Sequence, residues 1–161
     1  MAKTHTYAVT LTWTGNTGTG TSAYGAFERS SEVTAGSKAT LLASADPAFR
    51  GAPERWNPEE LLIASLSQCH MLWYLVLCAK EGIVVTAYVD HPSGTLAETP
   101  DGGGHFDEVT LHPEVTIATG DDVDRATQLH ERAHDLCFVA RSVNFDVHAE
   151  PTITAAAAAS S

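Results

Sequence analysis

The chain has 161 residues, of which 43% are hydrophobic, and its formal net charge at pH 7 is −11. This length is typical of one domain that buries its own core. An acidic chain is a poor ligand for nucleic-acid phosphates or for an anionic membrane surface, so we expect neither partner. The first residues lack a basic segment followed by an apolar run, which favours a cytoplasmic protein without a signal peptide.

The first third of the chain predicts two strands and two loops. Residues 6–13 alternate in the manner of a strand, and residues 26–36 form a second strand pattern. Between them, residues 14–25 are rich in glycine and threonine and predict a turn or flexible loop, without the Lys-Ser/Thr ending of a phosphate-binding loop. Residues 43–56 are interrupted by proline and glycine and predict another loop.

A long helix is predicted from Asn57 to Gly82. Asn57 is a favourable N-cap, Pro58 suits the first helical position, and Glu60 completes a capping box. Gly82 can end the helix in a left-handed conformation. The segment is apolar on nearly every face, but polar residues such as His70 lie at its middle. These features favour a buried central helix over a membrane span.

The remaining residues predict strands around a second helix. Strands are expected over residues 83–90, over 105–118 as one long strand or a pair, and over 142–153, with a loop over 94–104.

We expect Asp121 to cap the second helix, which runs to about Ala140 with its apolar residues at helical spacing. Strands therefore flank the helices in blocks, which predicts an α+β fold. We expect a single domain over residues 1–154 and a disordered tail over 155–161.

The second helix contains the motif H-E-x-x-H from His130 to His134, with Cys137 three residues later. Since a helix turns about 100° per residue, the two histidines and the cysteine fall within roughly 60° of arc, and zinc accepts this set of ligands. The motif is short, however, and Glu131 points away towards solvent. We therefore expect no metal site, and we expect both histidines to be half-buried or surface residues.

Cysteine chemistry is the stronger hypothesis. Three cysteines do not form a secreted disulfide framework, and in a reducing cytosol cysteines are more often catalytic than structural. Cys69 lies too far along its helix for the N-terminal dipole to activate it, so a reactive thiolate there needs a nearby cation. Arg29, Arg50 and Arg55 are the candidates. Cys78 lies about 180° around the helix from Cys69 and predicts a small buried hydrophobic residue.

The segments "NPEELLIASLSQC" and "AHDLCFVARSV" resemble the OsmC/Ohr family of thiol peroxidases. The family pattern is Asn-Pro-Glu-x-Leu with a cysteine ten residues after the glutamate, as Glu59 and Cys69 are here, and a second cysteine corresponds to Cys137. Many members have Cys-Pro at the second position, where this chain has Phe138. The resemblance implies an OsmC-like α+β fold with antiparallel sheets on a long central helix, a second helix, and an intertwined homodimer.

The resemblance also implies a mechanism without a cofactor. Cys69 attacks an organic hydroperoxide and becomes a sulfenic acid, Cys137 condenses with it, and an external dithiol such as a lipoyl protein reduces the disulfide. In the family a glutamate holds the activating arginine, a role that falls to Glu59. OsmC-like members favour Arg50 as that arginine and Ohr-like members favour Arg29.

Geometry adds a condition to this mechanism. Ten helical residues span about 15 Å, so Glu59 and Cys69 share a site only if an arginine bridges them, the helix breaks, or two copies of the helix pack antiparallel. We expect apolar walls for the peroxide from Leu66, Met71, Leu72, Trp73 and Tyr74. The alternatives are a non-enzymatic module that binds a small ligand or thiol, and a zinc site at His130, His134 and Cys137.

Overall fold

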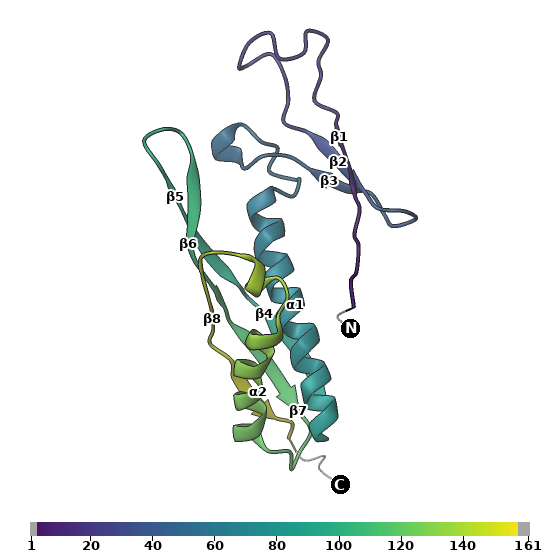
Figure 1. Ribbon diagram of the computed structural model, residues 1–161, viewed down its shortest axis with the longest axis vertical. Coiled ribbons are helices and arrows are strands. Elements are labelled where there is room, and N and C mark those ends of the chain that lie inside the picture. Colours follow the sequence, from purple (N-terminus) through teal and green to yellow (C-terminus); the bar gives the residue numbers. More distant parts are fainter. Residues whose placement is uncertain (1–2, 158–161) are drawn as a thin grey trace. The chain divides into compact units, whose positions relative to one another are not determined.

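A computed structural model describes residues 3–157 of the chain. The chain divides into two compact units, Met1–Leu62 and Ile63–Ser161, and each is considered by itself. Figure 1 shows the chain as a ribbon and labels most of its helices and strands. The prediction of a tail over residues 158–161 lies outside the described residues, while Ala155, the first residue of that predicted tail, belongs to a strand.

The N-terminal unit contains one antiparallel sheet. Its strands are β1 (Thr10–Trp13), β2 (Ser31–Thr34) and β3 (Leu41–Ala43), in the order β1-β2-β3. The first two lie inside the predicted strand segments and are shorter than expected. The third was missed because three residues are too few to show an alternating pattern. A short 3-10 helix, η1 (Pro47–Phe49), lies in the predicted proline-rich loop.

Helix α1 (Pro58–Glu81) begins as the sequence predicts. The Glu60 N–H donates to Asn57 Oδ1 at 2.7 Å, and the Asn57 N–H donates to Glu60 Oε2 at 3.2 Å. This reciprocal pair is a capping box. At the other end Gly82 has a φ of 76°, a left-handed conformation that glycine adopts without strain. Both predicted ends of the helix are confirmed.

Only one face of α1 is buried within the chain. Leu66, His70, Tyr74 and Cys78 recur at intervals of four and are the buried residues of the helix. Other apolar side chains remain open, and Leu72 is 53% exposed. The expectation of a buried helix is therefore met along one face. By length and composition alone α1 could cross a membrane, but core helices of globular proteins pass the same test, so this is weak evidence.

The C-terminal unit contains two three-stranded sheets. One has the order β4-β7-β9, with β4 (Val85–Asp90), β7 (Pro113–Ile117) and β9 (Thr152–Ala155). The other has the order β5-β6-β8, with β5 (Ser93–Glu98), β6 (Gly104–Leu111) and β8 (Asp146–Ala149).

Both sheets are mixed rather than purely antiparallel, because β8 and β9 pair in parallel with β6 and β7. The segment over residues 94–104 was wrongly expected to be a loop throughout, since its first five residues belong to β5, which pairs antiparallel with β6. Its glycines and its single proline concealed the strand pattern. The predicted final strand over 142–153 is two strands, separated at Glu150 and Pro151.

Helix α2 (Val123–Leu136) packs against β8 and β9. Its N-cap is Asp122, whose side chain accepts the Arg125 N–H at 2.9 Å, and not Asp121 as predicted. The Asp121 carboxylate instead accepts the Val84 N–H at 2.8 Å. The helix ends at Leu136, earlier than expected, and η2 (Ala140–Ser142) follows.

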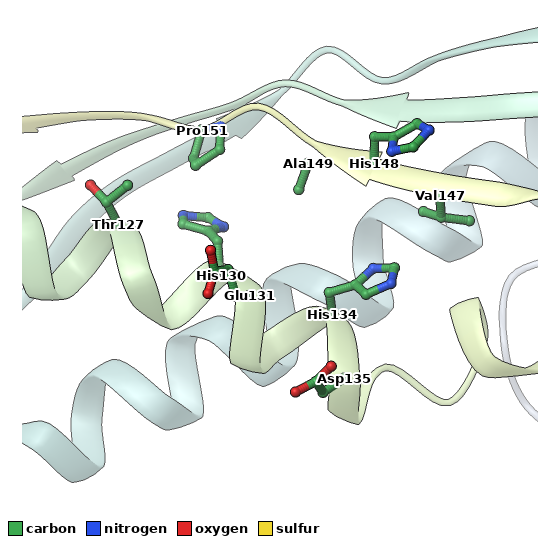
Figure 2. Close-up of a pocket in the computed structure, with 9 residues that line it drawn as sticks. All are labelled: Thr127, His130, Glu131, His134, Asp135, Val147, His148, Ala149 and Pro151. Atoms are coloured by element: carbon green, nitrogen blue, oxygen red, sulfur yellow. The ribbon is translucent and has the colours of Figure 1, made fainter.

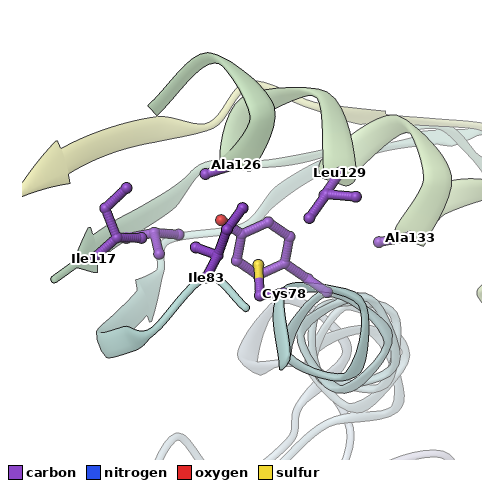
Figure 3. Packing of buried hydrophobic residues seen from close by; sticks show 8 residues of the cluster. Cys78, Ile83, Ile117, Ala126, Leu129 and Ala133 are labelled. Atoms are coloured by element: carbon purple, nitrogen blue, oxygen red, sulfur yellow. The ribbon is translucent and has the colours of Figure 1, made fainter. Parts of the chain in front are cut away.

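The core of the C-terminal unit lies between α1, α2 and the sheet of β4, β7 and β9 (Figure 3). Its buried residues come from all of these elements and are Tyr74, Cys78, Ile83, Val115, Ile117, Ala126, Leu129 and Ala133. This packing fixes the face that α1 presents to α2, and it therefore determines which residues of the two helices meet.

Candidate active site

The C-terminal unit places the side chains of Cys69 and Cys137 close enough for Cys69 to raise the pKa of Cys137. Cys69 lies in the middle of α1 and is half-buried, whereas Cys137 is the C-cap of α2 and is 1% exposed. Both are free cysteines. Two residues that are far apart in sequence thus meet where α2 ends against α1.

The surroundings of Cys137 keep its thiol protonated. The pKa of Cys137 is raised to about 11, with burial as the largest cause and the neighbouring Cys69 side chain as the next. The Ala140 N–H, which donates to Cys137 Sγ at 3.4 Å, acts in the opposite direction. The Cys137 thiol is therefore the protonated form at neutral pH.

An apolar cavity of about 420 Å³ opens beside Cys69. Its walls include the expected Leu72 and Trp73, together with Val76, Lys80 and Phe138. Two other expected wall residues, Leu66 and Tyr74, are fully buried in the core and do not line it. An accessible thiol next to an apolar cavity can receive a small molecule with a hydrocarbon group.

Phe138 is the residue that departs from the Cys-Pro pattern, and its ring forms part of the cavity wall. It packs edge-on against Trp73, with ring centroids 5.6 Å apart and an interplanar angle of 86°. The Phe138 side chain is nevertheless 67% exposed. The sequence identified the substitution but not this contact, since nothing in the local pattern shows that residues 73 and 138 meet.

Two of the candidate arginines share one cavity of the N-terminal unit. Arg29 and Arg50 both line it, and both guanidinium groups lie over the Tyr24 ring, at 4.6 and 5.6 Å from its centroid. Arg29 is held firmly, since it donates to the backbone oxygens of Phe27 and Tyr24 at 2.7 and 2.9 Å. Arg50 is exposed and, within this unit, its guanidinium makes no hydrogen bond to a described residue.

The third candidate, Arg55, donates to the Ser31 backbone oxygen at 3.3 Å and is half-buried. Arg50 also differs from the other two in its backbone. Its φ of 67° makes it the one non-glycine residue with a left-handed conformation in the described part of the chain. Such conformations in non-glycine residues occur more often at functional positions.

Glu59 lies in the first turn of α1, and its Oε2 atom is buried without a hydrogen-bond partner among the described residues. A buried carboxylate oxygen without a donor is costly, so this atom requires a partner. Helix α1 is continuous, which excludes a break between Glu59 and Cys69 within one chain. Two of the expected ways for Glu59 and Cys69 to share a site therefore remain, a bridging arginine and the antiparallel packing of two copies of the helix.

Cys78 is 1% exposed and belongs to the core cluster. Burial is the largest cause that raises the pKa of this thiol. The prediction that Cys78 is a small buried hydrophobic residue facing away from Cys69 is confirmed.

The H-E-x-x-H segment lies in α2, and its two histidines differ. His130 is 2% exposed, which contradicts the expectation of a half-buried or surface residue, while His134 is half-buried as predicted. His130 Nδ1 lies 2.9 Å from His70 Nε2, and the pKa of His130 is lowered to about 3, chiefly by burial. The regular spacing of the buried α1 residues could have identified His70 as buried, but its partner could not be inferred.

A cavity of about 430 Å³ lies between α2 and β8 and contains this motif (Figure 2). Its lining includes the side chains of His130, His134 and His148, which do not converge on one point in the view of Figure 2. Within residues 3–157 no group of three or more histidine, cysteine or acidic side chains is arranged to hold a metal ion.

The C-terminal unit is thus an α+β arrangement in which two helices meet and Cys69 lies close to Cys137. The family model for OsmC-like protein matches residues 51–151. The chain therefore belongs to the OsmC-like protein family.

Solved structures agree with this assignment. An OsmC-like protein of unknown function from Vibrio cholerae is 26% identical, with a TM-score of 0.78 over 92% of this chain and 100% of that one. An organic hydroperoxide resistance protein from Elizabethkingia anophelis is 20% identical, with a TM-score of 0.69 over 97% and 100%. One from Legionella pneumophila is 18% identical, with a TM-score of 0.67 over 95% and 99%. No curated protein matches the chain.

Proposed function

We propose that this protein is a cysteine-based peroxidase that reduces organic hydroperoxides and contributes to peroxide resistance in the cytoplasm. The observation that carries the proposal is the closeness of the Cys69 and Cys137 side chains beside an apolar cavity. The names of the Elizabethkingia and Legionella structures point to the same substrate class.

The proposed reaction begins when the Cys69 thiolate attacks the terminal peroxide oxygen. The O–O bond breaks, Cys69 becomes a sulfenic acid, and the alkoxide takes a proton and leaves as an alcohol. The Cys137 thiol then attacks the Cys69 sulfur, which forms the disulfide and releases water. A dithiol reductant, such as a lipoyl protein, reduces this disulfide by thiol–disulfide exchange.

We propose Arg50 as the cation that stabilises the Cys69 thiolate. Arg29 is the weaker candidate because two backbone oxygens already bind its guanidinium group. The Arg50 guanidinium is exposed and is held only by the Tyr24 ring within its unit. We further propose that the unpartnered Glu59 Oε2 accepts a hydrogen bond from this arginine in the active state.

We also propose that the active form is a homodimer. Apolar side chains remain exposed along the open face of α1 and on one face of β1, including Leu72, Val76, Leu11 and Trp13. Exposed apolar surface of this kind is typical of association between subunits. A second copy also provides a way to bring an arginine and a glutamate to Cys69. On this proposal, residues 1–154 act as one OsmC-like domain.

The test is peroxide consumption with cumene hydroperoxide and dihydrolipoamide. We expect the wild type to turn over, Cys69→Ser to be inactive, and Cys137→Ser to accumulate a sulfenic acid that dimedone traps. Mass spectrometry after one equivalent of hydroperoxide is expected to find a Cys69–Cys137 disulfide. Intact thiols after this treatment would contradict the proposal and favour a non-enzymatic binding module on the same fold.

A further inference from the structure

The His70–His130 pair connects α1 to α2 inside the core of the C-terminal unit. The two rings hydrogen bond over 2.9 Å and lie nearly parallel, with an interplanar angle of 14°. Their side chains are 1% and 2% exposed. The His130 ring also stacks on Tyr74, with centroids 3.8 Å apart. Burial lowers the pKa of both histidines, so at neutral pH one neutral ring donates to the other.

Stability does not explain this pair. His70 Nδ1 and His130 Nε2 are buried and have no hydrogen-bond partner among the described residues. One of these outer nitrogens carries a proton and the other a lone pair, and neither is paired with a described protein group. Apolar side chains of similar shape would fill the same space without this penalty. The pair therefore needs an explanation other than the free energy of folding.

A directional contact can do what apolar packing cannot. Apolar side chains allow two helices to slide or rotate slightly, whereas a buried hydrogen bond fixes their register. His70 is the neighbour of Cys69, and His130 lies two helical turns before Cys137 on the same side of α2. The register of α1 against α2 thus determines how the two sulfurs meet, and disulfide formation tolerates little error in their positions.

One other polar contact joins the two helices. Arg125 donates to both carboxylate oxygens of Glu81, at 2.6 and 2.8 Å. These side chains are exposed, 43% and 37%. Exposed ion pairs contribute little and are screened by salt, so they are a weak determinant of register.

We propose that the His70–His130 hydrogen bond is a register pin between α1 and α2 that positions the Cys137 thiol against Cys69 and sets how readily the two form a disulfide. Its benefit to the protein rests on the proposed function, because the pin accelerates removal of the Cys69 sulfenic acid. The coupling between the thiols, meaning how readily they form a disulfide, is independent of that function and can be measured with any oxidant.

The experiment measures this coupling without a peroxide. The protein is equilibrated with mixtures of reduced and oxidised dithiothreitol, alkylated, and analysed by mass spectrometry. In this exchange Cys69 and Cys137 lose two electrons and two protons and form one disulfide, while the cyclic dithiothreitol disulfide is reduced to its dithiol. The equilibrium constant reports the effective concentration of one thiol at the other.

Two variants remove the hydrogen bond from opposite sides. His130→Phe retains a ring to stack on Tyr74, and His70→Leu removes the partner ring. We expect each to lower the equilibrium constant by about tenfold or more, while the melting temperature stays equal to that of the wild type or rises. His130→Asn retains a polar atom near the Nδ1 position, and we expect it to recover most of the coupling.

Leu129→Val is the matched control, since Leu129 is a buried neighbour on α2 without a polar atom in its side chain. We expect it to lower the melting temperature and to change the equilibrium constant by less than about threefold. Three results would overturn the register pin. The equilibrium constant could fall equally in Leu129→Val and His130→Phe, it could stay unchanged in both histidine variants, or the wild type could form no disulfide. A wild type that forms the disulfide but does not consume hydroperoxide would overturn only the proposed function.

Discussion

Helix α1 carries two cysteines on opposite sides, and their surroundings differ. Cys78 faces the core of the C-terminal unit, where its side chain is 1% exposed and burial raises the pKa of its thiol. Cys69 faces an apolar cavity and lies close to a second cysteine. A thiol can act only where a reactant can approach, so the side of the helix, and not the presence of cysteine, separates the structural residue from the candidate nucleophile.

The largest effect that tests this comparison is the loss of each thiol. We expect Cys69→Ser to lower hydroperoxide consumption by about a hundredfold or more, because the nucleophile is removed. We expect Cys78→Ala to retain the activity and to lower the free energy of unfolding by about 1 kcal/mol, because it leaves a small void in the core. Peroxide assays and urea unfolding check both. An inactive but folded Cys78→Ala protein would break the comparison.

The next effect concerns the cation. Arg50→Ala is expected to lower kcat/KM for cumene hydroperoxide by about tenfold to a hundredfold, since the thiolate and the peroxide lose their positive partner. Arg29→Ala is expected to act mainly on stability, because its side chain binds two backbone oxygens of the N-terminal unit. Kinetics and melting curves of the two variants separate these roles. A larger loss of kcat/KM in Arg29→Ala than in Arg50→Ala would favour Arg29 as the activating residue.

A pH titration tests the buried face of α1, on which His70 lies together with Cys78. Burial is the largest cause that lowers the pKa of His70 from 6.5 to about 4, and His130 is lowered to about 3. His134 on α2 is the second cause of this lowering of the His70 pKa, and Asp90 on β4 partly opposes it. Both rings are therefore neutral in the folded protein at pH 7.

Since the unfolded chain binds protons at these groups below about pH 6.5 and the folded one does not, the free energy of unfolding falls as the pH drops from 6.5 towards 4. The loss attributable to His70 is at most about 3 kcal/mol. Urea unfolding between pH 7 and pH 4 measures it, and His130→Phe is expected to flatten the profile. An unchanged slope in this variant would show that other groups cause the acid sensitivity.

The smallest effect is expected at the cavity wall. Phe138→Ala removes the ring that packs on Trp73, so we expect the preference for cumene hydroperoxide over hydrogen peroxide to fall by about threefold to tenfold. The ratio of the two kcat/KM values measures this preference. Val123→Ala is a suitable control, because Val123 is exposed on the same helix as Cys137 but does not line this cavity.

The sequence predicts the parts of this molecule that depend on local chemistry. The capping box at Asn57 and the glycine at position 82 define α1 because each acts within one helical turn. The position of Cys78 follows from the helical angle alone. The capping residue of α2 was displaced by one position, since Asp121 and Asp122 are equally suitable as caps and the N–H of the distant Val84 occupies the first.

Features that depend on distant partners could not be predicted. Strand β5 has weak strand character of its own, and it exists because β6 pairs with it. Likewise the His70–His130 and Trp73–Phe138 contacts join residues that are more than 50 positions apart, and no spacing within either segment specifies them. The family resemblance supplied the expectation that Cys69 and Cys137 act together, whereas helical periodicity alone left Cys137 only a candidate.

The left-handed backbone of Arg50 has a consequence for any attempt to make this protein more robust. Glycine would adopt a φ of 67° without steric strain, and Arg50 is therefore the less stable choice for that turn. Selection for heat resistance alone would favour Arg50→Gly, and the same change would remove the cation proposed to activate the thiolate. Thermal tolerance and turnover are thus opposed at a single turn of the chain.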